Sequence, residues 1–170
     1  MNKDLKILIA TLVFSVILIV GLAALFGGKG EEEAIVAGQK VEGIEANPGV
    51  YDLGDVPING GLVTKEYEIK NTTGNTLKLK KIATSCMCTK ASFEIGETKT
   101  KFFGMEDHGD KNPPVNIEIS GGQTGKVVVQ FDPEAHGPQG TGPFDRSIYL
   151  TFSDPAGIKE LKFNGTVVSQ

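Results

Sequence analysis

The sequence holds few of the side chains that most often carry catalysis, because only two histidines and two cysteines occur among its 170 residues. It also lacks the short motifs of several large enzyme classes. No Gly-x-Ser-x-Gly elbow, no phosphate-binding glycine loop and no His-Glu-x-x-His pair is present. We therefore expect a binding protein with no catalytic residues rather than an enzyme.

The sequence also has no excess of basic residues, and its formal net charge is −4. The first 30 residues carry three lysines and one aspartate, so the remainder holds 14 basic and 20 acidic residues. Nucleic acids and anionic membrane surfaces both attract proteins through a basic surface. The composition disfavours both as partners of this part of the chain, and we expect no binding of nucleic acid.

Charged side chains are absent from Ile7 to Phe26, a run of about 20 residues, which is long enough to cross the hydrocarbon core of a bilayer. Lys3 and Lys6 precede the run and Glu31–Glu33 follow it, which predicts a cytoplasmic N-terminus and an extracytoplasmic domain, either periplasmic or on the cell surface. A cleaved signal peptide is the alternative, although such segments have a shorter apolar run. No cysteine directly follows the run, which excludes a lipoprotein anchor.

The pattern divides the chain into a cytoplasmic stub (1–6), a membrane span (7–26), a flexible Gly- and Glu-rich tether (27–48) and a folded domain (49–170). In the domain, short runs of β-forming residues alternate with turn residues, and no helical period is sustained. This spacing predicts seven or eight strands in an antiparallel two-sheet sandwich. The clearest strands are Val63–Asn71, Leu77–Ala83, Asn116–Ile119, Lys126–Phe131, Arg146–Phe152 and Ile158–Val168.

From about Val50 to Val168 the sequence resembles a bacterial family known as domain of unknown function 1573. The matching motifs are Tyr51–Gly54, Asn71–Gly74, Leu77–Leu79, Ser85–Thr89, Gly125–Phe131 with Asp132 and Pro133, and Gly165–Val167. The resemblance implies an Ig-like sandwich of the PapD and Hydin type, exported or anchored in a membrane. It supplies no activity. The expected fold is therefore all-β: an Ig-like antiparallel sandwich preceded by one transmembrane helix.

The sequence departs from the simplest family pattern in two places. FFGMEDHG, in the polar interval between Phe93 and Val115, is inserted after the Cys-x-Cys strand, and the Phe-Asp-Pro motif continues as FDPEAHGPQGTG. These two segments contain the chain's histidines, His108 and His136. Long excursions from a compact sandwich are more often functional than idle.

The motif TSCMCTK contains both cysteines, Cys86 and Cys88. On a strand, residues two apart face the same side, so their sulfurs could bind one ion. If Met105, His108 and His136 gather at the same end, the set of two thiolates, a thioether and two imidazoles favours copper, with zinc as the alternative. We therefore predict a metal site formed by Cys86, Cys88, Met105, His108 and His136.

Other interpretations of the cysteines remain open at this stage. They could be buried apolar side chains in a structural or protein-interaction module, whose partner would be another extracytoplasmic protein. They could also form a redox-active dithiol, although Lys90 is the only cation close to them in sequence. A disulfide is harder in extended chain, where the Cα atoms would lie about 6.5–7 Å apart, but a local bend would permit one. The oligomeric state is not indicated.

Overall fold

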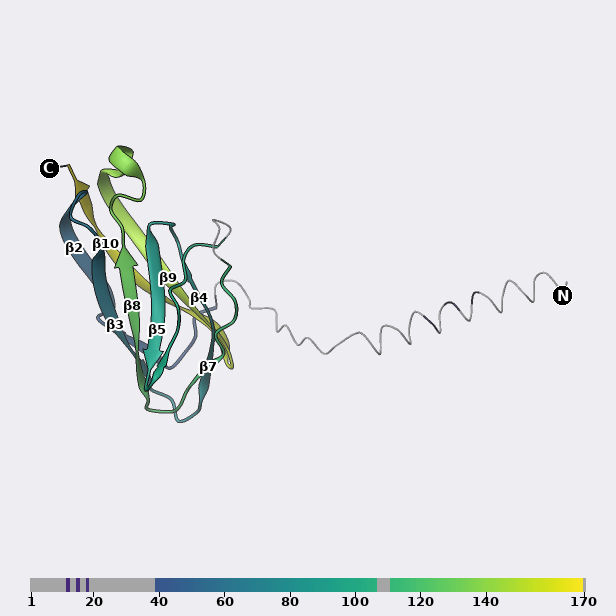
Figure 1. Ribbon diagram of the computed structural model, residues 1–170. Helices are drawn as coiled ribbons and strands as arrows, with labels where there is room; N and C mark the ends of the chain where they lie inside the picture. The colour runs from purple at the N-terminus through teal and green to yellow at the C-terminus, as the bar shows by residue number, and fades with distance from the viewer. Residues whose placement is uncertain (1–11, 13–14, 16–17, 19–38, 107–110, 170) are drawn as a thin grey trace. The chain divides into compact units, whose positions relative to one another are not determined.

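The computed structural model describes Leu12, Ser15, Leu18, residues 39–106 and residues 111–169 (Figure 1). Within these residues, ten strands build a two-layer sandwich, with one 3-10 turn, η1. The strands are β1 (Ile44–Asn47), β2 (Val50–Pro57), β3 (Val63–Asn71), β4 (Leu77–Thr84), β5 (Thr89–Ile95), β6 (Thr98–Lys99), β7 (Ile117–Ile119), β8 (Thr124–Phe131), β9 (Gly142–Ser153) and β10 (Ala156–Val168), and η1 is Gly137–Gly140.

Each sheet has five strands. Sheet I has the order β1-β3-β8-β5-β6, and all its neighbours are antiparallel. Sheet II has the order β2-β10-β9-β4-β7, and β2 runs parallel to β10 while the other pairs are antiparallel. The predicted all-β sandwich is confirmed. The expectation of purely antiparallel sheets is wrong at this one pair, because β2 and β10 lie far apart in sequence and no hairpin turn forces them to be antiparallel.

Alternating side chains explain how the sheets pack. On β3, Tyr67 and Ile69 are fully buried between the sheets, and the intervening Glu68 is exposed. The hydroxyl of Tyr67 donates a hydrogen bond to the Lys162 carbonyl of sheet II at 2.6 Å, which satisfies the one polar atom of this buried ring. Burial raises the Tyr67 pKa above its ordinary value, and nearby Tyr51 adds a smaller contribution.

The folded domain begins earlier than the sequence predicts. The sequence assigns residues 39–48 to the tether, but β1 pairs with β3, and Val41 is 2% exposed. The Val41 amide also donates a hydrogen bond to the Ile158 carbonyl of β10 at 3.1 Å. The segment has too few residues to show a strand period, and its buried side chains are separated by glycine and glutamate, so only its pairing partners define it as strand.

The expected membrane span, residues 7–26, lies outside the described residues apart from Leu12, Ser15 and Leu18. Among the residues that the structure describes, no helix is both long enough and apolar enough to cross a bilayer. The rest of the tether, residues 27–38, also lies outside the described part of the chain.

Two connections cross between the sheets at the same end of the sandwich. The β4–β5 turn leads from sheet II to sheet I, and the β8–β9 segment leads back. Because β5 and β8 are antiparallel, the first residue of β5, Thr89, pairs with the last residue of β8, Phe131. Because β4 and β9 are also antiparallel, Thr84 at the end of β4 pairs with Ile148. Both connections and the first half of β9 are therefore neighbours.

Candidate functional site

The two cysteines lie in the tight turn that joins β4 to β5, not within a strand. The amide of Thr89 donates a hydrogen bond to the Cys86 carbonyl at 3.1 Å, which closes the turn. The hydroxyl of Thr84 lies 3.0 Å from both the Cys86 and the Thr89 carbonyl oxygens, to either of which it can donate. Met87, at the centre of the turn, is 51% exposed. The prediction of an extended strand at this point is therefore wrong.

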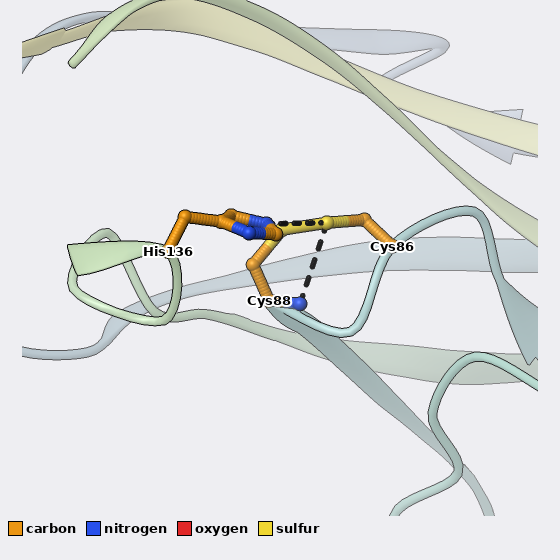
Figure 2. Close-up of side chains that lie close together, drawn as sticks. All are labelled: Cys86, Cys88 and His136. Carbon is orange, nitrogen blue, oxygen red and sulfur yellow. Dashed lines mark hydrogen bonds between the residues drawn. A yellow bond between two sulfur atoms is a disulfide. The ribbon is translucent and has the colours of Figure 1, made fainter. Parts of the chain in front are cut away.

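Cys86 and Cys88 form a disulfide (Figure 2). Their Cα atoms are 5.3 Å apart, inside the usual range for a bridge and shorter than an extended chain allows. The turn provides the bend that a bridge between these residues needs. Both cysteines belong to the buried core, as the core-packing interpretation expected, but they are bonded to each other rather than free.

The imidazole of His136 contacts the bridge at Cys86, with 3.1 Å between Nε2 and the Cys86 Sγ (Figure 2). A disulfide sulfur carries no hydrogen, so Nε2 acts as the donor in this contact. His136 follows the Asp132–Pro133 turn at the end of β8, where Asp132 Oδ1 accepts from the Glu134 amide at 2.9 Å. Gly140 of η1 allows the close approach, because a Cβ there would lie 2.9 Å from the Cβ of His136.

The guanidinium of Arg146 contacts the other sulfur. Its Nε donates a hydrogen bond to Cys88 Sγ at 3.3 Å, and its Nη1 donates to the Asp145 carbonyl at 2.9 Å. The guanidinium also lies over the Phe144 ring, 5.8 Å from its centroid, and this ring stacks on Phe131 of β8. These contacts fix a positive charge beside Cys88.

The backbone around the bridge is held by both neighbouring segments. The Asp132 amide donates to the Cys88 carbonyl at 2.8 Å, which ties the turn to the end of β8. On the other side, the Ser85 amide donates to the Ser147 carbonyl, and the Ser147 amide donates to Ser85 Oγ, each at 2.9 Å. The cysteine turn is therefore anchored to the segments that carry His136 and Arg146.

The structure brings together three of the five predicted ligands. One ligand atom from each of Cys86, Cys88 and His136 lies within 4.8 Å of the other two. His108 lies outside the described residues. Met105 follows Gly104, whose carbonyl accepts from the Thr84 amide at 3.2 Å, and its role as a ligand stays a prediction. The disulfide weakens the case for copper, because bonded sulfurs are not thiolates.

Sequence reasoning missed Arg146, which it placed only at the start of an expected strand. Arg146 lies 58 residues after Cys88, so its proximity depends on the pairing of β9 with β4. One signal was available, since Arg146 is the only arginine in the chain. Arginine presents a charged, rigid array of donors that lysine does not. A single arginine among many lysines is therefore a candidate for a specific contact.

Comparison with known proteins finds one family model that matches part of the chain. Residues 44–102 match the family described as "Protein of unknown function (DUF1573)". This match confirms the resemblance drawn from the sequence, and it includes the cysteine turn. The DUF1573 match ends before the segments that carry His136 and Arg146. No curated protein matches the sequence.

Solved structures of similar fold include a protein of unknown function from Porphyromonas gingivalis W83. The TM-score is 0.52 at 19% identity, over 80% of this chain and 51% of that one. This chain therefore spans about half the length of that protein. The PapD-like domain 7 of human CEP192 has a TM-score of 0.43 at 11% identity, over 75% of this chain and 87% of that one. At these identities the likeness concerns the fold alone.

Proposed function

We propose that this protein is a thiol–disulfide redox protein whose working group is the Cys86–Cys88 bridge. The observation that carries the proposal is the hydrogen bond from Arg146 Nε to Cys88 Sγ. Reduction converts a neutral bridge into thiolates or thiols, and a fixed cation stabilises a thiolate. The Nε2–H of His136 stabilises negative charge on Cys86 Sγ in the same way. Both contacts favour the reduced state and make the bridge easier to reduce.

A purely structural role explains these contacts less well. A disulfide stabilises a fold mainly by closing a loop in the unfolded chain, and the stabilisation grows with loop length. The loop from Cys86 to Cys88 has only three residues, for which chain entropy gives about 1.6 kcal/mol, roughly half the value for a 15-residue loop. The sandwich also has an extensive apolar core drawn from both sheets. A cation beside the bridge does not add to the stabilisation that a structural disulfide provides by closing a loop.

The proposed reaction is a two-electron exchange with the thiols of another exported protein. The bridge accepts two electrons as a partner dithiol becomes a disulfide, and the reduced pair can return them to a partner disulfide. The predicted extracytoplasmic location supports this function, because disulfides form and persist outside the cytoplasm. The predicted membrane span would keep the domain attached to the membrane.

The reduction potential tests this function. The full-length protein is equilibrated with glutathione redox buffers and then with dithiothreitol buffers, quenched in acid and alkylated, and its thiols are counted by mass spectrometry. We expect a potential between about −120 and −230 mV, the range of glutaredoxins and exported oxidoreductases. A value below about −300 mV is that of a structural disulfide. It would contradict the proposal and favour a structural or protein-interaction module.

A second function, soft-metal binding, is favoured by the convergence of Cys86, Cys88 and His136. Only the reduced protein would supply two thiolates and an imidazole, a set suited to Cu(I) and, with a fourth ligand, to zinc. Met105 and His108 remain the predicted additional ligands. The reduced and oxidised forms of the full-length protein are titrated anaerobically with Cu(I), and separately with Zn²⁺, and examined by native mass spectrometry. A stoichiometric adduct of the reduced form that weakens in His136→Ala supports this function, and its absence contradicts it.

A further inference from the structure

The two sulfurs of the bridge have different surroundings. Cys86 is 9% exposed, and its contact partner His136 is an exposed side chain. Cys88 is 2% exposed and is enclosed by Arg146 and by Thr89, whose Oγ1 lies 3.6 Å from Cys88 Sγ. An incoming thiol therefore meets less obstruction at Cys86. This difference in access favours attack on Cys86 over attack on Cys88.

We propose that an incoming thiolate attacks Sγ of Cys86 and that Cys88 is the leaving sulfur. This assignment rests on the redox function proposed above. The new bond joins the partner's sulfur to Cys86 Sγ, and the Cys86–Cys88 bond breaks with its electron pair moving to Cys88 Sγ. The product is a mixed disulfide at Cys86 and a thiolate at Cys88. The proton of the attacking thiol goes to solvent.

Charge favours this direction over the opposite one. In the proposed direction the negative charge develops on Cys88 beside the permanently charged guanidinium of Arg146, 3.3 Å away. In the opposite direction it would develop on Cys86, which His136 contacts through Nε2. Both contacts would be charge-assisted once a thiolate forms, but only the guanidinium brings a full positive charge at every working pH. Arg146 is therefore a positioning and charge-stabilising residue for the leaving sulfur.

The second half of the exchange uses His136. A second partner thiolate attacks the partner's own sulfur in the mixed disulfide, forming the partner disulfide and releasing Cys86 as a thiolate. The Nε2–H of His136 then donates to this thiolate across the contact that is 3.1 Å in the oxidised protein. Two electrons have passed from the partner dithiol to the bridge, and the partner's two protons have gone to solvent.

The surface beside Cys86 indicates the kind of thiol that is accepted. Met87 is 51% exposed next to the attacked residue, and methionine provides a flexible apolar contact that adapts to varied partners. The expected physiological partner is therefore a cysteine in a polypeptide segment that also supplies apolar side chains.

The oxidised full-length protein, treated briefly with reduced glutathione, tests the direction. The reaction is quenched in acid, free thiols are alkylated, and the tryptic peptide Ile82–Lys90 is sequenced by mass spectrometry. We expect glutathione on Cys86 and the alkyl group on Cys88, with at least about a tenfold excess over the reverse adduct, because the leaving thiolate at Cys88 gains both a hydrogen bond and a permanent positive charge from Arg146. Glutathione mainly on Cys88, or equally on both, overturns the assignment.

Variants of Arg146 distinguish two causes of the preference: stabilisation of the Cys88 thiolate by charge, and the greater accessibility of Cys86. Arg146→Met should reduce the excess of the Cys86 adduct, and Arg146→Lys should restore part of it. An unchanged ratio of Cys86 adduct to Cys88 adduct in Arg146→Met would show that Arg146 does not determine which sulfur is attacked. Failure of the redox function would give a different result. The folded protein would then form no glutathione adduct at either sulfur, whereas the urea-unfolded protein would form one.

Discussion

Arg146 Nε and Cys88 Sγ lie 3.3 Å apart although 58 residues separate them in the chain. The contact joins the first half of β9 to the turn that enters β5, so it spans the two sheets of the sandwich. It places the only arginine of the sequence against a disulfide sulfur. Two of the predictions below concern this end of the molecule, and two concern the packing of the sandwich.

Replacing Arg146 should make the bridge harder to reduce. Arg146→Met removes the hydrogen bond that stabilises a thiolate at Cys88, an interaction worth about 1.5 kcal/mol for a partly solvated charged donor, so the reduction potential should become about 30 mV more negative. Equilibration with glutathione buffers measures the change. Lys90→Met, which removes an exposed cation two residues after Cys88, is the matched control and should shift the potential less. Equal shifts would mean that general charge, and not this contact, is responsible.

Reduction of the bridge should leave the fold intact. Closing a three-residue loop contributes about 1.6 kcal/mol at most, and stabilisation of the reduced sulfurs by Arg146 and His136 makes the difference smaller. Urea unfolding of the oxidised and reduced protein, followed by far-ultraviolet circular dichroism, measures both free energies of unfolding. A loss above about 3 kcal/mol on reduction, within the range for native disulfides of small secreted domains, would identify the bridge as structural.

Gly125 on β8 should not tolerate a side chain. A Cβ at this position would lie 2.5 Å from Cζ of Phe93 and 3.1 Å from the Glu94 carbonyl oxygen. The Phe93 ring is fully buried and cannot move away freely, so Gly125→Ala should cost about 1–3 kcal/mol of unfolding free energy. Gly74→Ala is the control, because no atom lies within 4 Å of the added Cβ there. Similar urea midpoints for the two variants would show that sheet I adjusts without cost.

Alkaline pH should destabilise the domain through Tyr67. Burial raises the Tyr67 pKa above its ordinary value of 10.0, so above about pH 10 the tyrosine ionises in the unfolded chain before it does so in the folded one. The unfolded state then binds fewer protons, and stability falls by up to about 1.4 kcal/mol per pH unit as pH rises.

Urea unfolding between about pH 9 and 11, around the ordinary tyrosine pKa, checks this dependence. Tyr67→Phe loses the hydrogen bond to the Lys162 carbonyl and should be less stable at neutral pH, but its stability should decline less steeply above pH 10. Tyr149→Phe, at a half-buried position on β9, should keep the steep decline. The same alkaline slope in both variants would show that Tyr67 does not control it.

The sequence by itself determined the β architecture and the bounds of its most regular strands. Alternation predicted Val63–Asn71, which is β3, because a strand with one buried face must repeat every two residues. It also predicted β4 to within one residue. Strands without such a period were not predicted, or were predicted too short. β1 has only four residues and β6 only two, so their strand conformation depends on the strands with which they pair.

The sequence also selected Cys86 and Cys88 and suggested that His136 lies near them, but it placed the pair on a strand and did not point to Arg146. Only the tertiary structure showed the turn and the bridge, because a turn between two sheets depends on where each sheet ends. The tertiary structure also decided which side chain faces which sulfur. His136 and Arg146 reach Cys86 and Cys88 through the antiparallel registers of β5 with β8 and of β4 with β9. The hydrophobic pattern decides which face of each strand is buried, but which strands pair is decided by segments far apart in sequence.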